Sequence, residues 1–137
     1  MSTLADTNAL VALADRSEQG HDSMRRFLRS HRAPLLVPVT VLPEADYLVT
    51  RKVGLRAAMA MLQSVAEGAF QLVPLLDADL PRCIEMMRQY ADSDIGFVDA
   101  SIVAIAERLG VRRILTLDRR HFGIIRPRHC DAFTLLP

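Results

Sequence analysis

The chain has no tryptophan and only one lysine, and aromatic residues make up 5% of its 137 residues. It also has little net charge, because 17 Lys and Arg against 16 Asp and Glu leave a formal charge of +1 at pH 7. A nearly neutral chain lacks the overall positive field of a strongly basic nucleic-acid-binding protein. Contacts with nucleic acid would therefore depend on local groups of basic residues, all of which except Lys52 are arginine.

Metal-binding cysteine motifs, a secretory signal and a membrane span are also lacking. Cys83 and Cys130 form neither a Cys-x-x-Cys pair nor a Cys/His zinc spacing, which favours free thiols in a reducing cytosol. The start MSTLADTN has no basic residue and no apolar core. The longest uncharged apolar run, 33–43, contains three prolines and is too short for a membrane helix. We expect a cytoplasmic protein with no membrane partner.

Half of the residues are hydrophobic, which is enough to build the core of one domain spanning residues 1–137. Short apolar runs alternate with helical patterns, and no repeat or linker interrupts them, so we predict a single α/β domain. The expected strands are 3–5, 35–37, 70–76, 114–117 and 133–136, and the expected helices are 9–14, 21–32, 41–52, 55–67, 79–90 and 96–109. In the helix that ends near residue 90, we expect Ile84, Met87 and Tyr90 to face inward.

Two acids near the C-terminus lie where apolar patterning would not place them. Asp99 points into the apolar stripe of its predicted helix, where a carboxylate needs a partner. Asp118 ends the apolar run Ile114-Leu115-Thr116-Leu117, which is typical of a buried strand followed by a loop. The carboxyl ends of such strands gather ligands in open parallel sheets.

Two further acids have comparable positions in the first half of the chain. Asp6 follows the first predicted strand, where it could cap a helix or belong to a site at the edge of the sheet. Glu44 lies beside Leu48, at the margin of the apolar arc of its helix, as expected for a group that lines a cleft. If the four acids converge, mutual repulsion requires either that some take up protons or that a divalent cation lies among them. An all-oxygen set favours Mg²⁺ or Mn²⁺ over zinc.

Several motifs together resemble those of PIN-domain ribonucleases of the VapC toxin group. They are Leu-Ala-Asp-Thr-Asn at the start, Glu44 early in a helix, Phe-Val-Asp-Ala-Ser-Ile-Val-Ala from residue 97 and Thr-Leu-Asp-Arg-Arg-His-Phe from residue 116. The resemblance spans essentially the whole chain. It implies a PIN-like three-layer α/β/α sandwich around a mainly parallel sheet of four or five short strands.

The resemblance also implies a function and a set of site residues. The chain would be a Mg²⁺- or Mn²⁺-dependent endoribonuclease that leaves a 5′-phosphate and a 3′-hydroxyl. Its metal-binding and catalytic residues would be Asp6, Glu44, Asp99 and Asp118, supported by Thr7, Asn8 and Thr116. In the connection before residue 96, Asp92 or Asp94 could cap the next helix, and either could support the site; Asp92 is the candidate. The basic segment after residue 111 suggests Arg112, Arg119 and Arg120 as contacts to RNA phosphates.

Members of this group form homodimers and are silenced by a VapB-type antitoxin, so the resemblance implies both partners. The apolar helices 41–52 and 55–67 are the candidate antitoxin contacts. A housekeeping RNA-processing PIN nuclease and a catalytically silent binding module remain alternatives. A phosphoacceptor domain is disfavoured because it needs a lysine after a late strand, and a haloacid-dehalogenase-like phosphatase because Asp6-Thr7-Asn8 departs from Asp-x-Asp.

Overall fold

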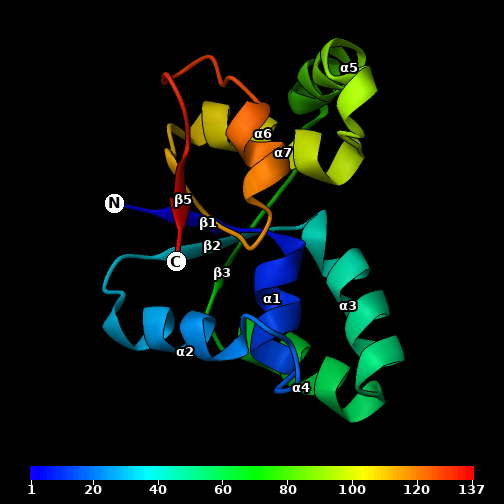
Figure 1. The fold of residues 1–137 in the computed structure, drawn as a ribbon, viewed down its shortest axis with the longest axis vertical. Helices are drawn as coiled ribbons and strands as arrows, with labels where there is room; N and C mark the ends of the chain where they lie inside the picture. The colour runs from blue at the N-terminus through cyan, green and yellow to red at the C-terminus, as the bar shows by residue number, and fades with distance from the viewer.

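The computed structural model describes all residues 1–137 and contains one five-stranded sheet (Figure 1). The strands are β1 (Thr3–Ala5), β2 (Leu35–Pro38), β3 (Gln71–Val73), β4 (Arg113–Leu115) and β5 (Thr134–Leu136). Their order across the sheet is β3-β2-β1-β4-β5, and every neighbouring pair is parallel. The chain therefore builds one half of the sheet outward from β1 and then crosses to the other side of β1 to build the second half.

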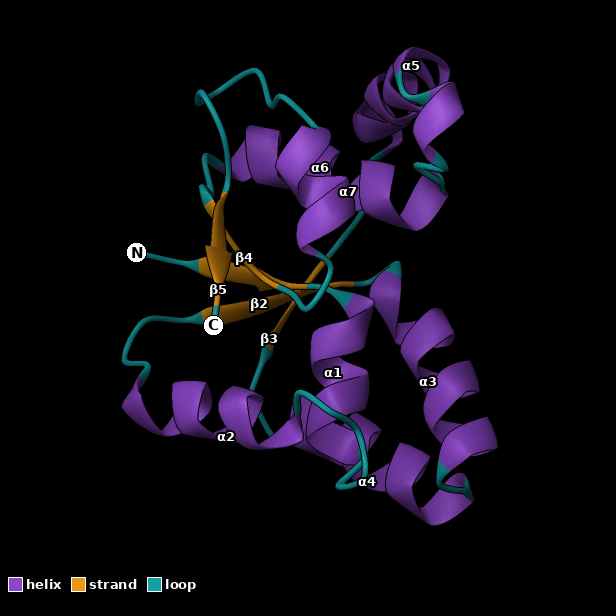
Figure 2. Ribbon diagram, in the orientation of Figure 1, coloured by secondary structure: helices purple, strands orange, loops and turns teal.

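Helices cover both faces of this sheet (Figure 2). One layer holds α1 (Thr7–Ala14), α2 (His21–Ser30), α3 (Val41–Lys52) and α4 (Leu55–Ala66). The other holds α5 (Leu80–Gln89), α6 (Phe97–Leu109) and the short α7 (Arg119–Ile124). Single 3₁₀ turns at Asp77–Asp79 and Ala91–Ser93 precede and follow α5. The predicted three-layer α/β/α sandwich with a parallel sheet is confirmed.

The core is a single cluster of 31 buried hydrophobic residues between the sheet and the two helical layers. Helix α6 contributes an unbroken buried run to this region, since every residue from Ala100 to Ala106 is buried. Asp99 immediately precedes this run, in the first turn of α6, where the helix dipole favours a negative charge. The position of Asp99 is therefore set by the packing of the helix that follows it.

The inward face of α5 was predicted wrongly. Cys83 and Met86 are buried, whereas Ile84 and Met87 are 49% and 37% exposed. Tyr90 is half-buried and packs against the core, as expected. The sequence of α5 carries two apolar stripes about one residue apart, and docking against α6 selects the Cys83 stripe.

Other element boundaries differ from expectation for local reasons. The predicted strand 70–76 is only three residues long, because Pro74 has no N–H to continue the ladder, and it lies at the edge of the sheet. Helix α7 was not predicted, and the segment after Asp118 was expected to be a loop. None of the helices has the length and apolar character needed to cross a bilayer.

Candidate functional site

The four acids predicted from the sequence line one cleft with a volume of about 470 Å³. Asp6 follows β1, Asp118 follows β4, Glu44 is in the first turn of α3 and Asp99 is in the first turn of α6. Successive strands are added on one side of β1 as far as β3 and then on its other side, beginning with β4. The cleft beside β1 and β4 therefore lies at the topological switch point of the sheet. Four separate segments of the chain therefore contribute one carboxylate each.

Asp6 is the most buried of these carboxylates, at 4% exposure. Its Oδ1 accepts a hydrogen bond of 2.6 Å from the N–H of Thr7 at the start of α1, and its Oδ2 accepts one of 2.9 Å from the hydroxyl of Thr116. Asp6 thus caps α1 and also faces the cleft, so both interpretations of this residue hold. Burial raises the pKa of Asp6 to about 7, with repulsion from Asp99 and Asp118 adding to the rise and the two hydrogen bonds opposing it.

The predicted supporting residues Thr116 and Asn8 connect the ends of β1 and β4. The hydroxyl of Thr116 donates to Asp6 and accepts a hydrogen bond of 2.9 Å from the N–H of Asp118. The side-chain oxygen of Asn8 accepts a hydrogen bond of 2.9 Å from the N–H of Leu117. These contacts hold the segment after β4 against the start of α1.

Thr7 has a different role, because its hydroxyl is buried and has no hydrogen-bond partner although it lines the cleft. The contribution of Thr7 to the site is therefore its backbone N–H, which donates to Oδ1 of Asp6. Asp92, predicted to support the site, is exposed and lies outside the cleft lining. Asp94 lines the cleft instead and adopts a left-handed conformation with φ of 57°.

His121 joins two of the acids and was not identified from the sequence. Its Nδ1 lies 2.9 Å from Oδ2 of Asp118 and 3.2 Å from Oδ2 of Asp99. Its backbone N–H also donates to Oδ1 of Asp118, which caps α7. The sequence signal for this residue is the spacing Asp118-x-x-His121 at the start of a helix, because it places the histidine one turn after the capping carboxylate.

Burial and several charged neighbours affect the pKa of Asp99. Burial raises its pKa, the nearby His121 opposes that rise, and the negative charges of Asp118 and Glu44 add to it. Glu44 itself is exposed at the rim of the cleft. The electrostatic interactions therefore connect all four acids, since Asp6 also interacts with Asp99 and Asp118.

The three arginines predicted to hold RNA do not line the cleft. Arg112 directly precedes β4 and so lies at the amino end of a strand whose carboxyl end leads to Asp118. The guanidinium of Arg119 donates a hydrogen bond of 2.9 Å to the backbone oxygen of Pro137, and Arg120 is exposed. The cations that do line the cleft are Lys52 and, when protonated, His121.

As they stand, no three His, Cys, Asp or Glu side chains are arranged as a ready-made metal cage. Mg²⁺ does not require such a cage, because it commonly retains several waters and uses one or two carboxylates together with substrate phosphate. The donors of the cleft are carboxylate and hydroxyl oxygens, which suit a hard cation. Among them, Asp6 and Asp99 carry the carboxylates whose pKa values are raised by burial.

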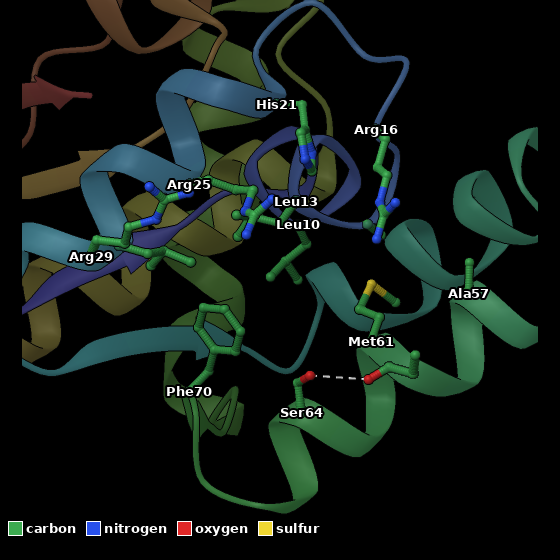
Figure 3. A pocket seen from close by; sticks show the side chains of 13 residues that line it. Leu10, Leu13, Arg16, His21, Arg25, Arg29, Ala57, Met61, Ser64 and Phe70 are labelled. Carbon is green, nitrogen blue, oxygen red and sulfur yellow. Dashed lines mark hydrogen bonds between the residues drawn. The ribbon is translucent and has the colours of Figure 1, made fainter.

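A second cavity of about 490 Å³ lies between α1, α2 and α4 (Figure 3). Its apolar lining includes Leu10, Leu13, Met61 and Phe70. Its charged lining consists of Arg16, Arg25 and Arg29, with no acidic residue. We call this surface the arginine groove. His21 closes one side of it, with Nδ1 2.6 Å from the backbone oxygen of Ala12.

Comparison with known proteins identifies the family. Residues 3–125 match the model of the PIN domain. Over 134 residues the chain is 38% identical to Ribonuclease VapC26 of Mycobacterium tuberculosis, an alignment that covers 98% of this chain and 99% of the relative.

Solved structures share the fold at low sequence identity. The crystal structure of Mycobacterium tuberculosis VapC20, described as a sarcin-ricin-loop-cleaving toxin, superimposes with a TM-score of 0.81 at 20% identity, covering 86% of this chain and 91% of that one. The structure of VapBC2 from Rickettsia felis, bound to a DNA fragment from its promoter, gives a TM-score of 0.71 at 14% identity over the full length of both chains. With its carboxylates gathered at the switch point of a PIN-type sheet, this chain belongs to the PIN-domain family and, within that family, to the VapC ribonucleases.

Proposed function

We propose that this VapC-type ribonuclease is a Mg²⁺- or Mn²⁺-dependent endoribonuclease that hydrolyses RNA phosphodiester bonds and acts as the toxin of a toxin–antitoxin pair. The observation that carries the proposal is the meeting of four carboxylates, from four separate segments, in one cleft. The name of its relative, Ribonuclease VapC26, supports RNA as the substrate.

The residues present fit a hard divalent cation. Asp6 and Asp99 are the proposed direct ligands, because burial penalises their ionised forms and a cation would offset that penalty. Glu44 and Asp118 would complete the acidic set, directly or through water.

In the proposed mechanism, a bound ion would lower the pKa of a water molecule and neutralise charge on the phosphate. The chain's own residues prepare the site for this chemistry. Thr116 and the N–H of Thr7 hold both oxygens of Asp6, and His121 holds the Oδ2 atoms of Asp99 and Asp118 on one side of the cleft. Asp6, Asp99 and Asp118 are therefore oriented before substrate binds, which reduces the reorganisation needed during reaction.

A housekeeping role in RNA processing is the alternative closest to this proposal. The same carboxylate cleft would serve either role, so the distinction depends on the partner. A small antitoxin-like reading frame beside the gene would favour the toxin assignment. A catalytically silent module is less favoured, because the complete acidic set is retained in one cleft.

The proposed partner is a VapB-type antitoxin, and the structure offers the arginine groove as its docking surface. The groove combines apolar side chains with three arginines and no acids, which suits an amphipathic segment that carries acidic residues. Solved complexes with similar folds include a toxin–antitoxin complex from Klebsiella pneumoniae. Of the two helices predicted for this contact, α4 contributes to the groove and α3 does not.

A homodimer is also proposed. Leu80, Ile84 and Met87 are between 37% and 49% exposed and share one face of α5, at spacings of four and three residues. Leu76, just before α5, is 43% exposed. A patch of this kind on a small domain supports association with a second copy.

The test of the proposed activity compares the wild type with Asp99→Asn on a panel of structured RNAs in Mg²⁺, in Mn²⁺ and in chelator. Loss of one carboxylate ligand should reduce cleavage by about two orders of magnitude or more, and chelator should abolish cleavage by the wild type. Asp131→Asn is the matched control, because it makes the same chemical change at an exposed residue outside the cleft. Equal cleavage by Asp99→Asn, or undiminished cleavage in chelator, would contradict the proposal.

A further inference from the structure

Helix α3 lines the cleft with three residues, not only with Glu44. Glu44, Leu48 and Lys52 lie at i, i+4 and i+8, and all three belong to the cleft lining. At 1.5 Å per residue, Lys52 lies about 12 Å along the helix from Glu44. The cleft therefore extends from the four acids to the last turn of α3.

Lys52 is the one permanently cationic side chain in this lining. The carboxylates that line the cleft are Asp6, Glu18, Glu44, Asp94, Asp99 and Asp118. Such a surface repels a polyanion, and a divalent cation among the acids would offset the charge only at one end. A strand of RNA that enters the cleft needs a second cation at the other end, and Lys52 is positioned there.

In the free protein, the ammonium group of Lys52 is paired with Glu18, which comes from the segment between α1 and α2. The Nζ to Oε2 distance is 3.6 Å, and the two side chains are 46% and 33% exposed. A long, partly solvated ion pair of this kind contributes little to stability and exchanges partners readily. Glu18 therefore keeps Lys52 at the mouth of the cleft without holding it strongly.

We propose that Lys52 is a substrate-binding residue that contacts an RNA phosphate flanking the scissile one, and that this phosphate displaces Glu18. The proposal deepens the proposed ribonuclease function and rests on it. Lysine acts as a flexible point charge, so it contributes affinity for the RNA backbone and does not read the base sequence. Its removal should weaken binding of different RNAs to a similar degree and leave the cut position unchanged.

The first test measures RNA affinity against salt concentration. A fluorescein-labelled single-stranded RNA is titrated, in Mg²⁺, with protein carrying Asp99→Asn so that cleavage does not interfere, and anisotropy reports binding. Lys52→Met should weaken binding by about three- to tenfold at low salt and reduce the slope of log K against log salt by about 0.7, which is the loss of one phosphate contact on a single strand. Lys52→Arg should retain the slope, and Glu18→Gln should tighten binding about two- to threefold, because the competing anion is gone.

Arg51→Met is the matched control. It removes the same charge one residue away, but Arg51 donates to the hydroxyl of Tyr47 and does not line the cleft. It should change the salt slope by much less than Lys52→Met does. An unchanged salt slope for Lys52→Met would overturn the assignment, and so would an equal reduction of the slope by Arg51→Met. Melting temperatures would verify that each variant is folded.

The second test uses the fact that Lys52 is the only lysine of the chain. An amine-acetylating reagent can modify only this side chain and the N-terminal amine, and mass spectrometry separates the two products. Bound RNA should protect Lys52 from acetylation and leave the N-terminal amine reactive. Equal acetylation of Lys52 with and without saturating RNA would contradict the contact.

The two proposals can fail separately. If the wild type cleaves RNA and Lys52→Met has the same KM and salt dependence, only the role of Lys52 fails. If the wild type cleaves no RNA in either metal, the ribonuclease mechanism fails, while the binding and acetylation experiments still decide whether Lys52 contacts RNA. Support for the role of Lys52 also requires that Lys52→Met raise KM for cleavage more than it lowers kcat.

Discussion

The hydroxyl of Thr116 donates a hydrogen bond of 2.9 Å to Oδ2 of Asp6, across 110 residues of sequence. This bond joins the carboxyl ends of the adjacent strands β1 and β4. It also opposes the burial-driven rise in the pKa of Asp6, because a donor to a carboxylate favours its ionised form. Because β1 and β4 are neighbours, Thr116 can reach Asp6 and favour its ionised form in the cleft.

The first prediction concerns this bond. Thr116→Val keeps the shape of the side chain but removes the donor, so the pKa of Asp6 should rise above its present value of about 7. Fewer molecules then carry an ionised Asp6 at neutral pH, and Mg²⁺ affinity near pH 7 should fall by about three- to tenfold. Calorimetric titration with Mg²⁺ at several pH values measures this change.

Thr116→Ser is the control for that experiment, because it retains the hydroxyl and should keep affinity near that of the wild type. The difference in Mg²⁺ affinity between Thr116→Val and the wild type should also become smaller as the pH rises well above 7, because Asp6 is then ionised in both proteins. If Thr116→Val lowers Mg²⁺ affinity by the same factor at every pH, the cause is disturbed packing and not a raised pKa of Asp6.

The second prediction concerns stability without metal. The pKa of Asp6 is about 7 in the folded protein and 3.8 in the reference state, so the native state binds more protons than the unfolded state between these values. The free energy of unfolding should therefore decrease as the pH rises from about 4 to about 7, by a few kcal/mol at most, and change little from this group above that range. Urea denaturation in chelator at several pH values tests this dependence.

Asp6→Asn removes the titrating group but keeps an acceptor that can cap α1. In chelator, this variant should match the wild type near pH 4 and be more stable than the wild type near pH 8. Mg²⁺ should stabilise the wild type at pH 8 and have much less effect on the variant. If the variant were less stable than the wild type at pH 8 without metal, Asp6 would be primarily a structural residue.

The third prediction concerns the antitoxin. Arg29→Glu reverses a charge in the arginine groove, so it should weaken binding of the proposed antitoxin by tenfold or more, while RNA cleavage by the free toxin is retained. Arg26→Glu is the matched control, since Arg26 is exposed on the same helix and does not line the groove. Co-purification and calorimetry with the proposed antitoxin measure both variants. Equal weakening by the two substitutions would indicate a general charge effect instead of docking in the groove.

Most helices and strands could be predicted because the sequence patterns that specify them lie within each segment. The helix 41–52 and the first strand 3–5 have the predicted bounds, since an apolar arc with Pro43 in the first turn and a short apolar run are sufficient signals. Helix α5 shows the limit of this reasoning. Its sequence allows two inward faces, and only the shape of α6 decides between them.

The four acids could be selected from the sequence because each occupies a strand end or an apolar helix face. The partners that tune them could not be selected in the same way. His121 contacts Asp99 from α7, a helix that the sequence did not predict, and Lys52 reaches the cleft only because α3 runs along it. The predicted RNA contacts, chosen from a basic stretch of sequence, lie outside the cleft because charge density along a chain does not specify its position in space.

By itself, the sequence determined the class of fold, the family resemblance and the identity of the acids, because these depend on periodicity and on residue types at local positions. Only the tertiary structure decided that β1 and β4 are neighbours, and therefore that the acids share one cleft with Thr116, His121 and Lys52. The physical reason is that strand order arises from how the helices pack on both faces of the sheet, a property of the whole chain that no short segment encodes.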